Sequence, residues 1–229
     1  MPKAKLTNNT TKWGFLGSPR FAAVCGILGP LVGFSCIGIA VVLSASWFNW
    51  FFYALSDLGN PIMLGGFHGI SGVNPAALVF NGGMFVTGVL AAFFGLQLFL
   101  IQRSQKSLIG ASGGVLFIIS MICLAGVGVF NEVLLLGHVI TATGFFFGVM
   151  LASIVYGVAL LRVAKSRLLG ILTFVMGIII LATLLMMFGR LLPFTGAAVP
   201  EMIVAVAAFA WVVPISIRLY MGAGKHPSS

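Results

Sequence analysis

The sequence predicts an all-α integral membrane protein, a polytopic bundle of six transmembrane helices with both termini in the cytoplasm. Three observations predict this fold class. First, 60% of the 229 residues are hydrophobic and only 7% are charged, whereas soluble domains carry about 25% charged residues. Second, six apolar runs are long enough to cross a bilayer. Third, nearly all basic residues fall on one side of these runs.

Each run holds the roughly 20 apolar residues that a helix needs to cross a hydrocarbon core about 30 Å thick. A helix also satisfies its own backbone polar groups, as a single segment in lipid must. The six-helix domain is expected over residues 20–220, between a basic tail, 1–19, and a polar tail, 221–229. The expected spans are residues 20–44, 76–101, 107–130, 137–161, 168–189 and 200–219.

The orientation follows from the basic residues. With six spans, eleven of the twelve Lys and Arg residues fall on the side of the termini, and only Arg190 falls on the other. The eleven are Lys3, Lys5, Lys12, Arg20, Arg103, Lys106, Arg162, Lys165, Arg167, Arg218 and Lys225. The positive-inside rule places both termini in the cytoplasm. It also explains the net charge of +9, so no nucleic-acid partner is expected.

The connection between the first two spans, residues 45–75, is the only long loop and lies on the outer side. Trp47, Trp50 and Tyr53 are amphipathic aromatic residues of the kind found at head-group depth. Apolar residues recur through 47–55, which predicts an interfacial or re-entrant helix. A glycine and a proline in SDLGNP would end this helix.

Pairs of glycines at four-residue spacing favour close helix packing, either within the bundle or in a homo-oligomer. These pairs are Gly29 with Gly33, Gly110 with Gly114, and Gly144 with Gly148.

All three acids, Asp57, Glu132 and Glu201, fall on the outer side, together with His138 and the only outer arginine, Arg190. Ionisable groups near an apolar boundary are functional candidates by default. There are structural alternatives. The first two acids could be exposed loop residues, the helix dipole favours the third at a helix start, and a backbone carbonyl could satisfy the histidine. The arginine is expected to pair with Glu201 or Glu132, or with a lipid phosphate.

Glu132 and His138 are also candidates for a proton-transfer pair, because a carboxylate beside a histidine can relay protons. The outer loop adds His68 on the same side. The spacing of these residues matches neither HExxH nor a Cys/His zinc pattern, and the chain lacks a GxSxG elbow, a P-loop and a Rossmann fingerprint. No metal and no cofactor are therefore predicted.

Several short motifs occur in order: LSDLG, VFNGGM, GVFNE followed by GHVITATGFFF, and PEM. Together, over about residues 20–220, they resemble a prokaryotic six-span membrane family catalogued as domain of unknown function 998. That family is distantly similar to eukaryotic membrane proteins of GPI-anchor lipid remodelling and autophagy modulation. Here GVFNE stands where the family is expected to have a proline before the acid. The resemblance implies a fold and a set of shared polar residues, but no reaction. These residues are Ser56, Asp57, Asn81, Glu132, His138 and Glu201.

The leading functional hypothesis is an outward-facing polar pocket that binds a lipid head group or a small polar ligand. The candidate ligand-binding residues are Ser56, Asp57, Asn81, Glu132, His138, Arg190 and Glu201. Three alternatives stay open. The first is a membrane enzyme acting on a lipid, with Glu132 and His138 as the catalytic candidates. The second is a small transporter, and the third is a scaffold subunit without chemistry.

Overall fold

The computed structural model describes residues 18–63 and 72–223. The regular secondary structure of the described residues is helical except for one pair of two-residue strands, and six helices are long and apolar enough to cross a membrane. The predicted six-helix, all-α architecture is confirmed at this level. The helices are α1 (Pro19–Leu43), α3 (Ala76–Ser104), α4 (Leu108–Val129), α5 (Leu135–Leu161), α6 (Arg167–Phe188) and α7 (Ala198–Gly222).

The shorter elements lie in the connections. Three are 3-10 turns, η2 (Ser56–Gly59), η3 (Glu132–Leu134) and η4 (Ala164–Ser166). Strands β1 (Ile62–Met63) and β2 (Gly72–Val73) pair antiparallel, with Ile62 opposite Val73. His68 lies between these strands, outside the described residues.

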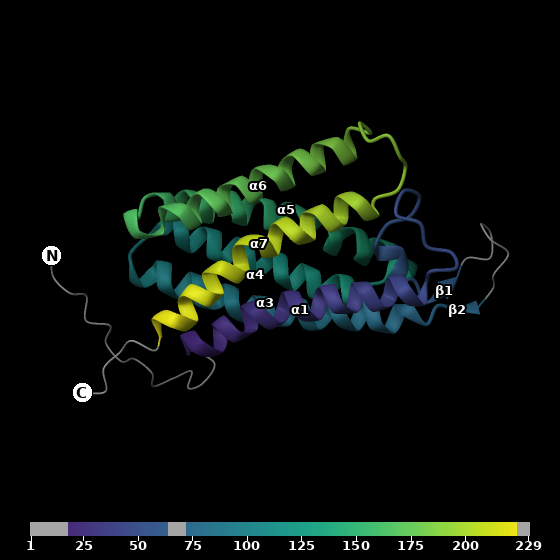
Figure 1. Ribbon diagram of the computed structural model, residues 1–229, viewed down its shortest axis with the longest axis horizontal. Coiled ribbons are helices and arrows are strands. Elements are labelled where there is room, and N and C mark those ends of the chain that lie inside the picture. Colours follow the sequence, from purple (N-terminus) through teal and green to yellow (C-terminus); the bar gives the residue numbers. More distant parts are fainter. Residues whose placement is uncertain (1–17, 64–71, 224–229) are drawn as a thin grey trace.

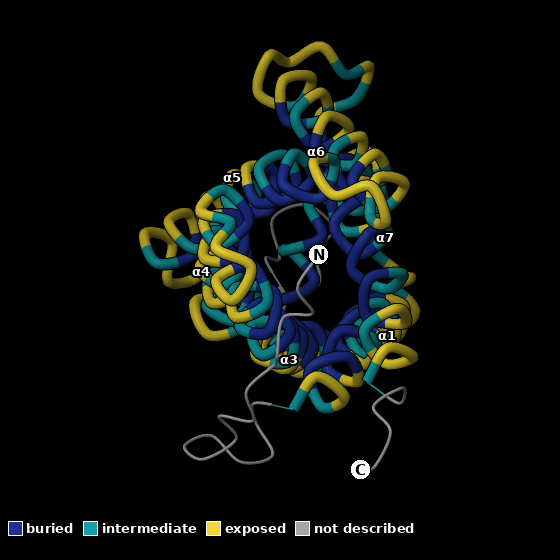
Figure 2. The backbone as a smooth tube through the Cα atoms, turned by 90° about the vertical axis from the view of Figure 1, so that its left-hand side faces the viewer, coloured by how far each residue is buried: buried dark blue, intermediate teal, exposed yellow. Residues whose placement is uncertain are grey.

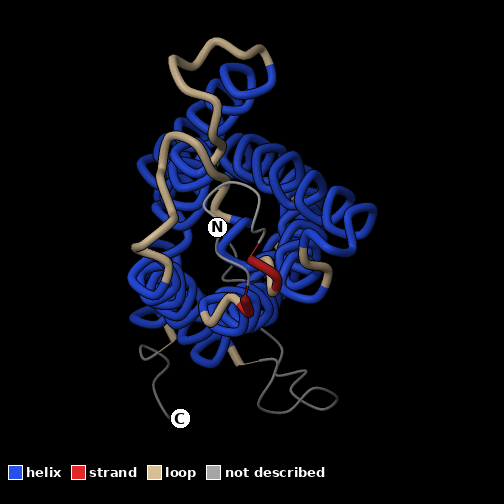
Figure 3. Tube along the Cα trace, turned by 90° about the vertical axis from the view of Figure 1, so that its right-hand side faces the viewer, coloured by secondary structure: helices blue, strands red, loops and turns tan. Residues whose placement is uncertain are grey.

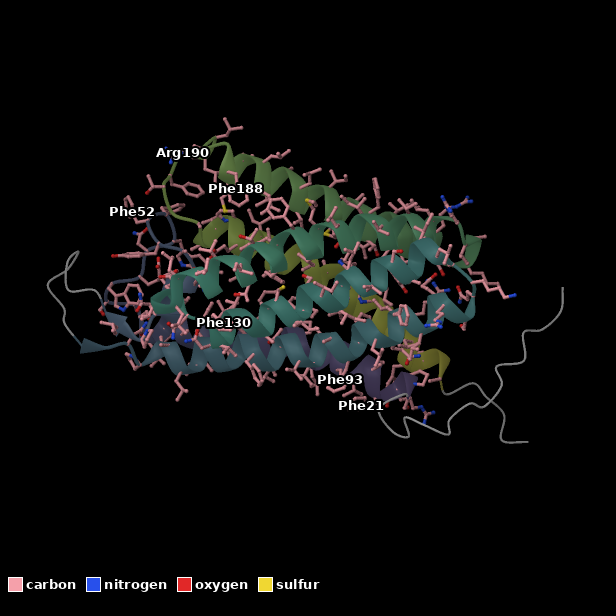
Figure 4. All side chains as sticks on the ribbon, turned by 180° about the vertical axis from the view of Figure 1, so that it is seen from behind. Phe21, Phe52, Phe93, Phe130, Phe188 and Arg190 are labelled. Atoms are coloured by element: carbon pink, nitrogen blue, oxygen red, sulfur yellow. The ribbon has the colours of Figure 1, made fainter. Side chains whose placement is uncertain are left out.

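The six long helices form a ring in which each helix packs against its neighbours in sequence, and α7 closes the ring against α1. Successive helices run in opposite directions, so α1 begins and α7 ends at the same end of the bundle (Figure 1). The segment with η2 lies at the other end, which we call the η2 end. The end at which α1 begins is called the opposite end. Figure 4 shows Phe52 and Phe130 at the η2 end, and Phe21 and Phe93 at the opposite end.

The glycine pairs predicted from the sequence face neighbouring helices within this ring. A Cβ atom on Gly114 would lie 2.8 Å from the backbone of Phe99 on α3, and one on Gly148 would lie 2.8 Å from Ser120 on α4. The glycines thus let backbones approach closely inside one chain, in line with the packing of small residues in membrane helices. Homo-oligomerisation stays a prediction.

Aromatic side chains fill the middle of the ring. Trp211 is fully buried on α7, with edge-to-face packing against Phe117 at 5.2 Å and stacking on Tyr156 at 6.0 Å between ring centroids. Phe117 in turn packs edge-to-face on Phe94. The indole nitrogen of Trp211 donates to the hydroxyl oxygen of Ser153 at 3.0 Å. The central part of the bundle is therefore a dense core with its polar atoms paired.

Residues 47–55 form isolated turns rather than the predicted interfacial or re-entrant helix. The side chain of Asn49 accepts the backbone N–H of Phe51 at 2.9 Å, and such a local bond competes with helix formation. The carbonyl oxygens of Phe51 and Tyr53 accept instead from Gly196 (2.8 Å) and Ala198 (2.9 Å), just before and at the start of α7. The helical turn in this connection is η2, which comes after the predicted position.

Gly196 is essential to this docking. A Cβ atom there would lie 2.7 Å from the backbone carbonyl carbon of Phe52 and 2.7 Å from the carbonyl oxygen of Tyr53. The connection 44–59 therefore lies directly against the start of α7.

The η2 end of α6 and the following residues 189–197 project away from the ring (Figure 3). Helix α6 ends in a Schellman motif, because Leu191 N–H bonds to Met186 O at 3.0 Å and Arg190 N–H to Met187 O at 3.2 Å. Arg190 takes the left-handed position of this motif, with φ of 54°. The local backbone thus holds Arg190 on the projecting segment.

Gly88 on α3 gives a test of the packing. A Cβ atom there would clash with the α4 backbone at Met121 and Ala125, whereas Gly82 on the same helix has open space. We predict that Gly88→Ala costs about 1–3 kcal/mol, the usual cost of overpacking, and lowers the melting temperature in detergent. Gly82→Ala should leave it unchanged or raise it, because alanine favours helix. Equal melting temperatures for the two variants would contradict the close α3–α4 contact.

Candidate functional site

The η2 turn lies over the η2 end of the ring and is fixed to α3 by two asparagines. The side-chain nitrogen of Asn74 donates to the carbonyl oxygens of Leu58 (3.0 Å) and Asn60 (2.9 Å). The side-chain nitrogen of Asn81 donates to the carbonyl oxygen of Gly59 at 2.8 Å. Asn81, a predicted ligand-binding residue, thus holds the backbone of η2 in place.

Asp57 lies within η2 and meets Glu132 from η3. Its Oδ2 atom accepts the backbone N–H of Ala54 at 2.7 Å, and its carboxyl group hydrogen-bonds to that of Glu132. Burial, this hydrogen bond and the negative charge of Glu132 together raise the pKa of Asp57 from 3.8 to about 7. Two carboxyl groups in direct contact share a proton readily, because both cannot ionise at low cost.

Glu132 is positioned by the turn that joins α4 to α5. Asn131 caps η3, its side chain accepting the N–H of Val133 at 3.1 Å. This fixes Glu132 where the hydroxyl of Ser56 donates to its Oε1 atom at 2.9 Å. Ser56, Asp57 and Glu132 therefore form one connected group across two loops that are 76 residues apart in sequence.

Glu201 joins this group from the first turn of α7. Its Oε2 atom accepts the backbone N–H of Leu55 at 2.6 Å, and the carboxyl group also bonds to the N–H of Ser56. It lies within electrostatic range of both Asp57 and Glu132. The three acids of the chain, from η2, η3 and the first turn of α7, thus meet at one end of the bundle, as the sequence predicted.

His138 lies on the first turn of α5 and is 8% exposed. Its Nδ1 atom is 2.9 Å from the carbonyl oxygen of Phe130. Because a carbonyl can only accept, Nδ1 carries the hydrogen, and Nε2 of the neutral ring is an acceptor. Within the described part of the chain, no hydrogen bond engages Nε2. The carbonyl partner expected for this histidine is present, but it satisfies only one of the two ring nitrogens.

A cavity of about 70 Å³ lies beneath η2, between five of the six helices. Its walls are mainly apolar, and its lining includes Phe34, Phe80, Met84, Leu124, Phe145 and Phe209. Three polar residues, Ser56, His138 and Glu201, line its η2 end. The fourth polar residue in the lining, Thr87, donates to the carbonyl oxygen of Gly29 at 3.2 Å. The surface of the cavity is therefore almost wholly apolar, and three polar residues border it at the η2 end.

Arg190 is the predicted site residue that the structure keeps apart from this group. It is exposed on the projecting segment, and the groove that it lines is built from Met187 and residues 192–197, without a carboxylate. The predicted pairing of Arg190 with Glu201 or Glu132 is wrong, because Glu201 bonds to the backbone of residues 55 and 56 instead. Contact with a lipid phosphate stays a prediction.

The acids are arranged for hydrogen bonding rather than for metal binding. Among the described residues, no three His, Cys, Asp or Glu side chains are placed to hold a metal ion together. Glu132 is engaged by Ser56 and Asp57, and His138 by Phe130. Glu132 and His138, the predicted proton-transfer pair, therefore both lie near Asp57, and each of the two hydrogen-bonds to a different partner.

Three features of the site had no clear signal in the sequence. Asn74 was not among the predicted site residues, yet its side-chain nitrogen holds η2. The backbone N–H groups of Leu55 and Ser56 bind Glu201, and backbone donors carry no sequence signature. Small cavity-lining residues such as Ala142 and Ala205 likewise look like ordinary transmembrane alanines.

The chain was compared with known families, curated proteins and solved structures. Residues 27–218 match the family described as protein of unknown function (DUF998). This range covers the whole group of polar residues described above. The comparisons with curated proteins and with solved structures gave no match.

The raised pKa of Asp57 gives a prediction for stability. A group whose folded-state pKa exceeds its unfolded value binds protons more tightly when folded, so its contribution is full below about pH 4 and is lost as the pH rises through about 7. We predict that the wild-type melting temperature falls over this window. Asp57→Asn should flatten the fall and make the protein more stable than wild type above about pH 7, since asparagine can still accept from Ala54. Parallel pH profiles for the two proteins would contradict this.

Proposed function

We propose that this chain, which belongs to the DUF998 family, binds a membrane amphiphile at the η2 end of its bundle. The apolar part of the ligand next to its head group would occupy the cavity beneath η2. The head group would meet Ser56, His138 and Glu201, with Asp57 and Glu132 behind them. The single observation that carries the proposal is an apolar cavity that three polar residues border at its η2 end.

The chemistry of the lining supports an amphiphile over a purely polar ligand. A polar solute would leave its hydrogen-bonding groups unpaired against walls such as Phe80 and Leu124, which costs free energy. A purely apolar ligand would not use the polar side chains that border the cavity at its η2 end. Sites for small molecules commonly combine mostly apolar walls with a few placed polar groups, and a molecule with one polar end matches both parts here.

The density of the central core bears on the transporter alternative. Below the cavity, Trp211, Phe94 and Phe117 are fully buried and packed on one another. A carrier would need an alternative arrangement in which this core opens. Binding needs no such rearrangement, so we take it as the main proposal. The expected similarity to proteins of GPI-anchor remodelling stays a prediction and is not used here.

We also propose that the η2 end faces the cell exterior and that both termini are cytoplasmic. The described basic residues at the opposite end are Arg20, Arg103, Lys106, Arg162, Lys165, Arg167 and Arg218. Only Arg190 lies at the η2 end. This imbalance supports the orientation through the positive-inside rule.

Filling the cavity should abolish binding. Ala205 lines the cavity, whereas its neighbour Val206 is 52% exposed on the outside of the same helix. We predict that Ala205→Phe removes a co-purifying lipid or bound amphiphile detected by native mass spectrometry. Val206→Phe is the matched control and should retain it, because its added ring points away from the cavity. Equal retention by both variants, each folded by its melting curve, would overturn the proposal.

Orientation can be tested with single cysteines at exposed positions. We expect Thr195→Cys, on the α6–α7 connection, to react with a membrane-impermeant maleimide on intact cells. Gln105→Cys, on the α3–α4 connection, should react only after permeabilisation. The native cysteines, Cys25, Cys36 and Cys123, lie within the long helices and should give a low background in the unsubstituted protein. The reverse labelling pattern would place the η2 end in the cytoplasm.

A further inference from the structure

We propose that the head group recognised at the η2 end is a primary ammonium group, so that the ligand is a long-chain amine or an amine-headed lipid. This inference rests on the proposed function, because it names the chemical class of the amphiphile bound there. It follows from two independent features of the polar end, its hydrogen-bonding capacity and its charge.

The first feature is that the polar residues of the cavity offer acceptors. Nδ1 of His138 donates to Phe130, so Nε2 of the neutral ring can only accept. The hydroxyl hydrogen of Ser56 is directed to Glu132, which leaves the lone pairs of Ser56 Oγ. A carboxylate has about four acceptor positions, and Glu201 uses two of them for the N–H groups of Leu55 and Ser56.

A ligand that complements this set must therefore be rich in donors. An ammonium group carries three N–H donors and no acceptor, so it can bond to Nε2 of His138 and to the remaining lone pairs of Ser56 and Glu201. A phosphate or carboxylate head group would place its own acceptor oxygens against the acceptors of the protein, and two acceptors form no hydrogen bond with each other. A hydroxyl group offers one donor and would leave the other positions unpaired.

The second feature is a set of acids that no described Lys or Arg neutralises. Glu201 senses the charges of Asp57 and Glu132, those two carboxyl groups are in direct contact, and Asp57 also has a charge interaction with His138. In the described part of the chain, the Lys and Arg residues lie at the opposite end, apart from Arg190 on the projecting segment. A cation bound beside Glu201 would add positive charge there and relieve the repulsion among the acids.

His138 adds a further acceptor at the polar end of the cavity. Its ring is 8% exposed and lines the cavity, and its Nδ1 atom is engaged by the carbonyl oxygen of Phe130. Nε2 of the neutral ring can accept a hydrogen bond from a donor in the cavity, and an ammonium group is a donor that also suits the acids.

The test compares amphiphiles that share one chain and differ in the head group. Purified full-length protein in maltoside micelles is mixed with dodecylamine, dodecanol or dodecyl phosphate at about pH 8, where ordinary imidazoles are neutral and alkylamines stay protonated. Binding is measured by native mass spectrometry and by the shift in melting temperature. We expect dodecylamine to bind at least about tenfold more tightly than the other two, the scale of a charge-assisted hydrogen bond.

Glu201→Gln is the informative variant, because glutamine keeps an acceptor for the Leu55 N–H but removes the charge. It should reduce the preference for dodecylamine over dodecanol by about tenfold. Ala205→Phe should abolish binding of all three probes. Should Glu201→Gln fold poorly, the head-group preference of the wild-type protein still decides the question.

The outcomes separate the two proposals. Equal or tighter binding of dodecyl phosphate or dodecanol, still sensitive to Ala205→Phe, would overturn the ammonium assignment and leave amphiphile binding intact. Failure of all three probes to bind, or binding insensitive to Ala205→Phe, would overturn the proposed function itself. Preference for dodecylamine that Glu201→Gln leaves intact would show that the acids do not recognise the head group, and would also overturn the assignment.

Discussion

The hydrogen bond from the backbone of Leu55 to the carboxyl group of Glu201, at 2.6 Å, is the interaction on which the η2 end depends. The connection 44–59 lies on the end of an apolar bundle without forming a continuous helix, so its N–H groups need other partners. An unsatisfied buried backbone donor costs about 1–3 kcal/mol. Glu201 satisfies two such donors, and Asp57 satisfies a third, that of Ala54. The same bonds fix the polar end of the cavity.

This arrangement gives the acids a structural role, and that role must be weighed against ligand binding. Holding η2 requires acceptors, which asparagine and glutamine provide without a buried charge. Asn49 shows this in the same connection, because its side-chain oxygen accepts the N–H of Phe51. Three carboxyl groups within electrostatic range of one another are a costlier solution, and the cost is visible in the raised pKa of Asp57. The excess of charge over what the fold requires is the reason to assign a ligand to this end.

The sequence predicted the architecture well because length and hydropathy govern membrane helices strongly. The runs around Cys25 and Trp211, for example, are too long and too apolar to be anything else. The meeting of Asp57, Glu132 and Glu201 was also predictable, since the span count alone assigns them to one end. Their partners were not, because the Leu55 N–H is invisible in a sequence.

The two wrong expectations have local causes. Apolar recurrence through 47–55 predicted a helix, but Asn49 and the pairing with residues 196–198 favoured turns. Arg190 was expected beside the acids because opposite charges attract. The Schellman motif that ends α6 holds its backbone on the projecting segment instead. In both cases, backbone hydrogen bonds decided between conformations that side-chain pattern alone could not separate.

The position of the cavity within the ring bears on what kind of ligand can reach it. η2 closes the bundle end, through Asn74 and Asn81 on one side and Glu201 on the other, and the aromatic core around Trp211 closes the path from the opposite end. A water-soluble ligand would have to displace η2 and break these hydrogen bonds. A membrane-resident ligand has a less costly route between the helices, because apolar helix contacts exchange readily with lipid contacts. The construction of the site therefore favours an amphiphile that arrives from within the bilayer.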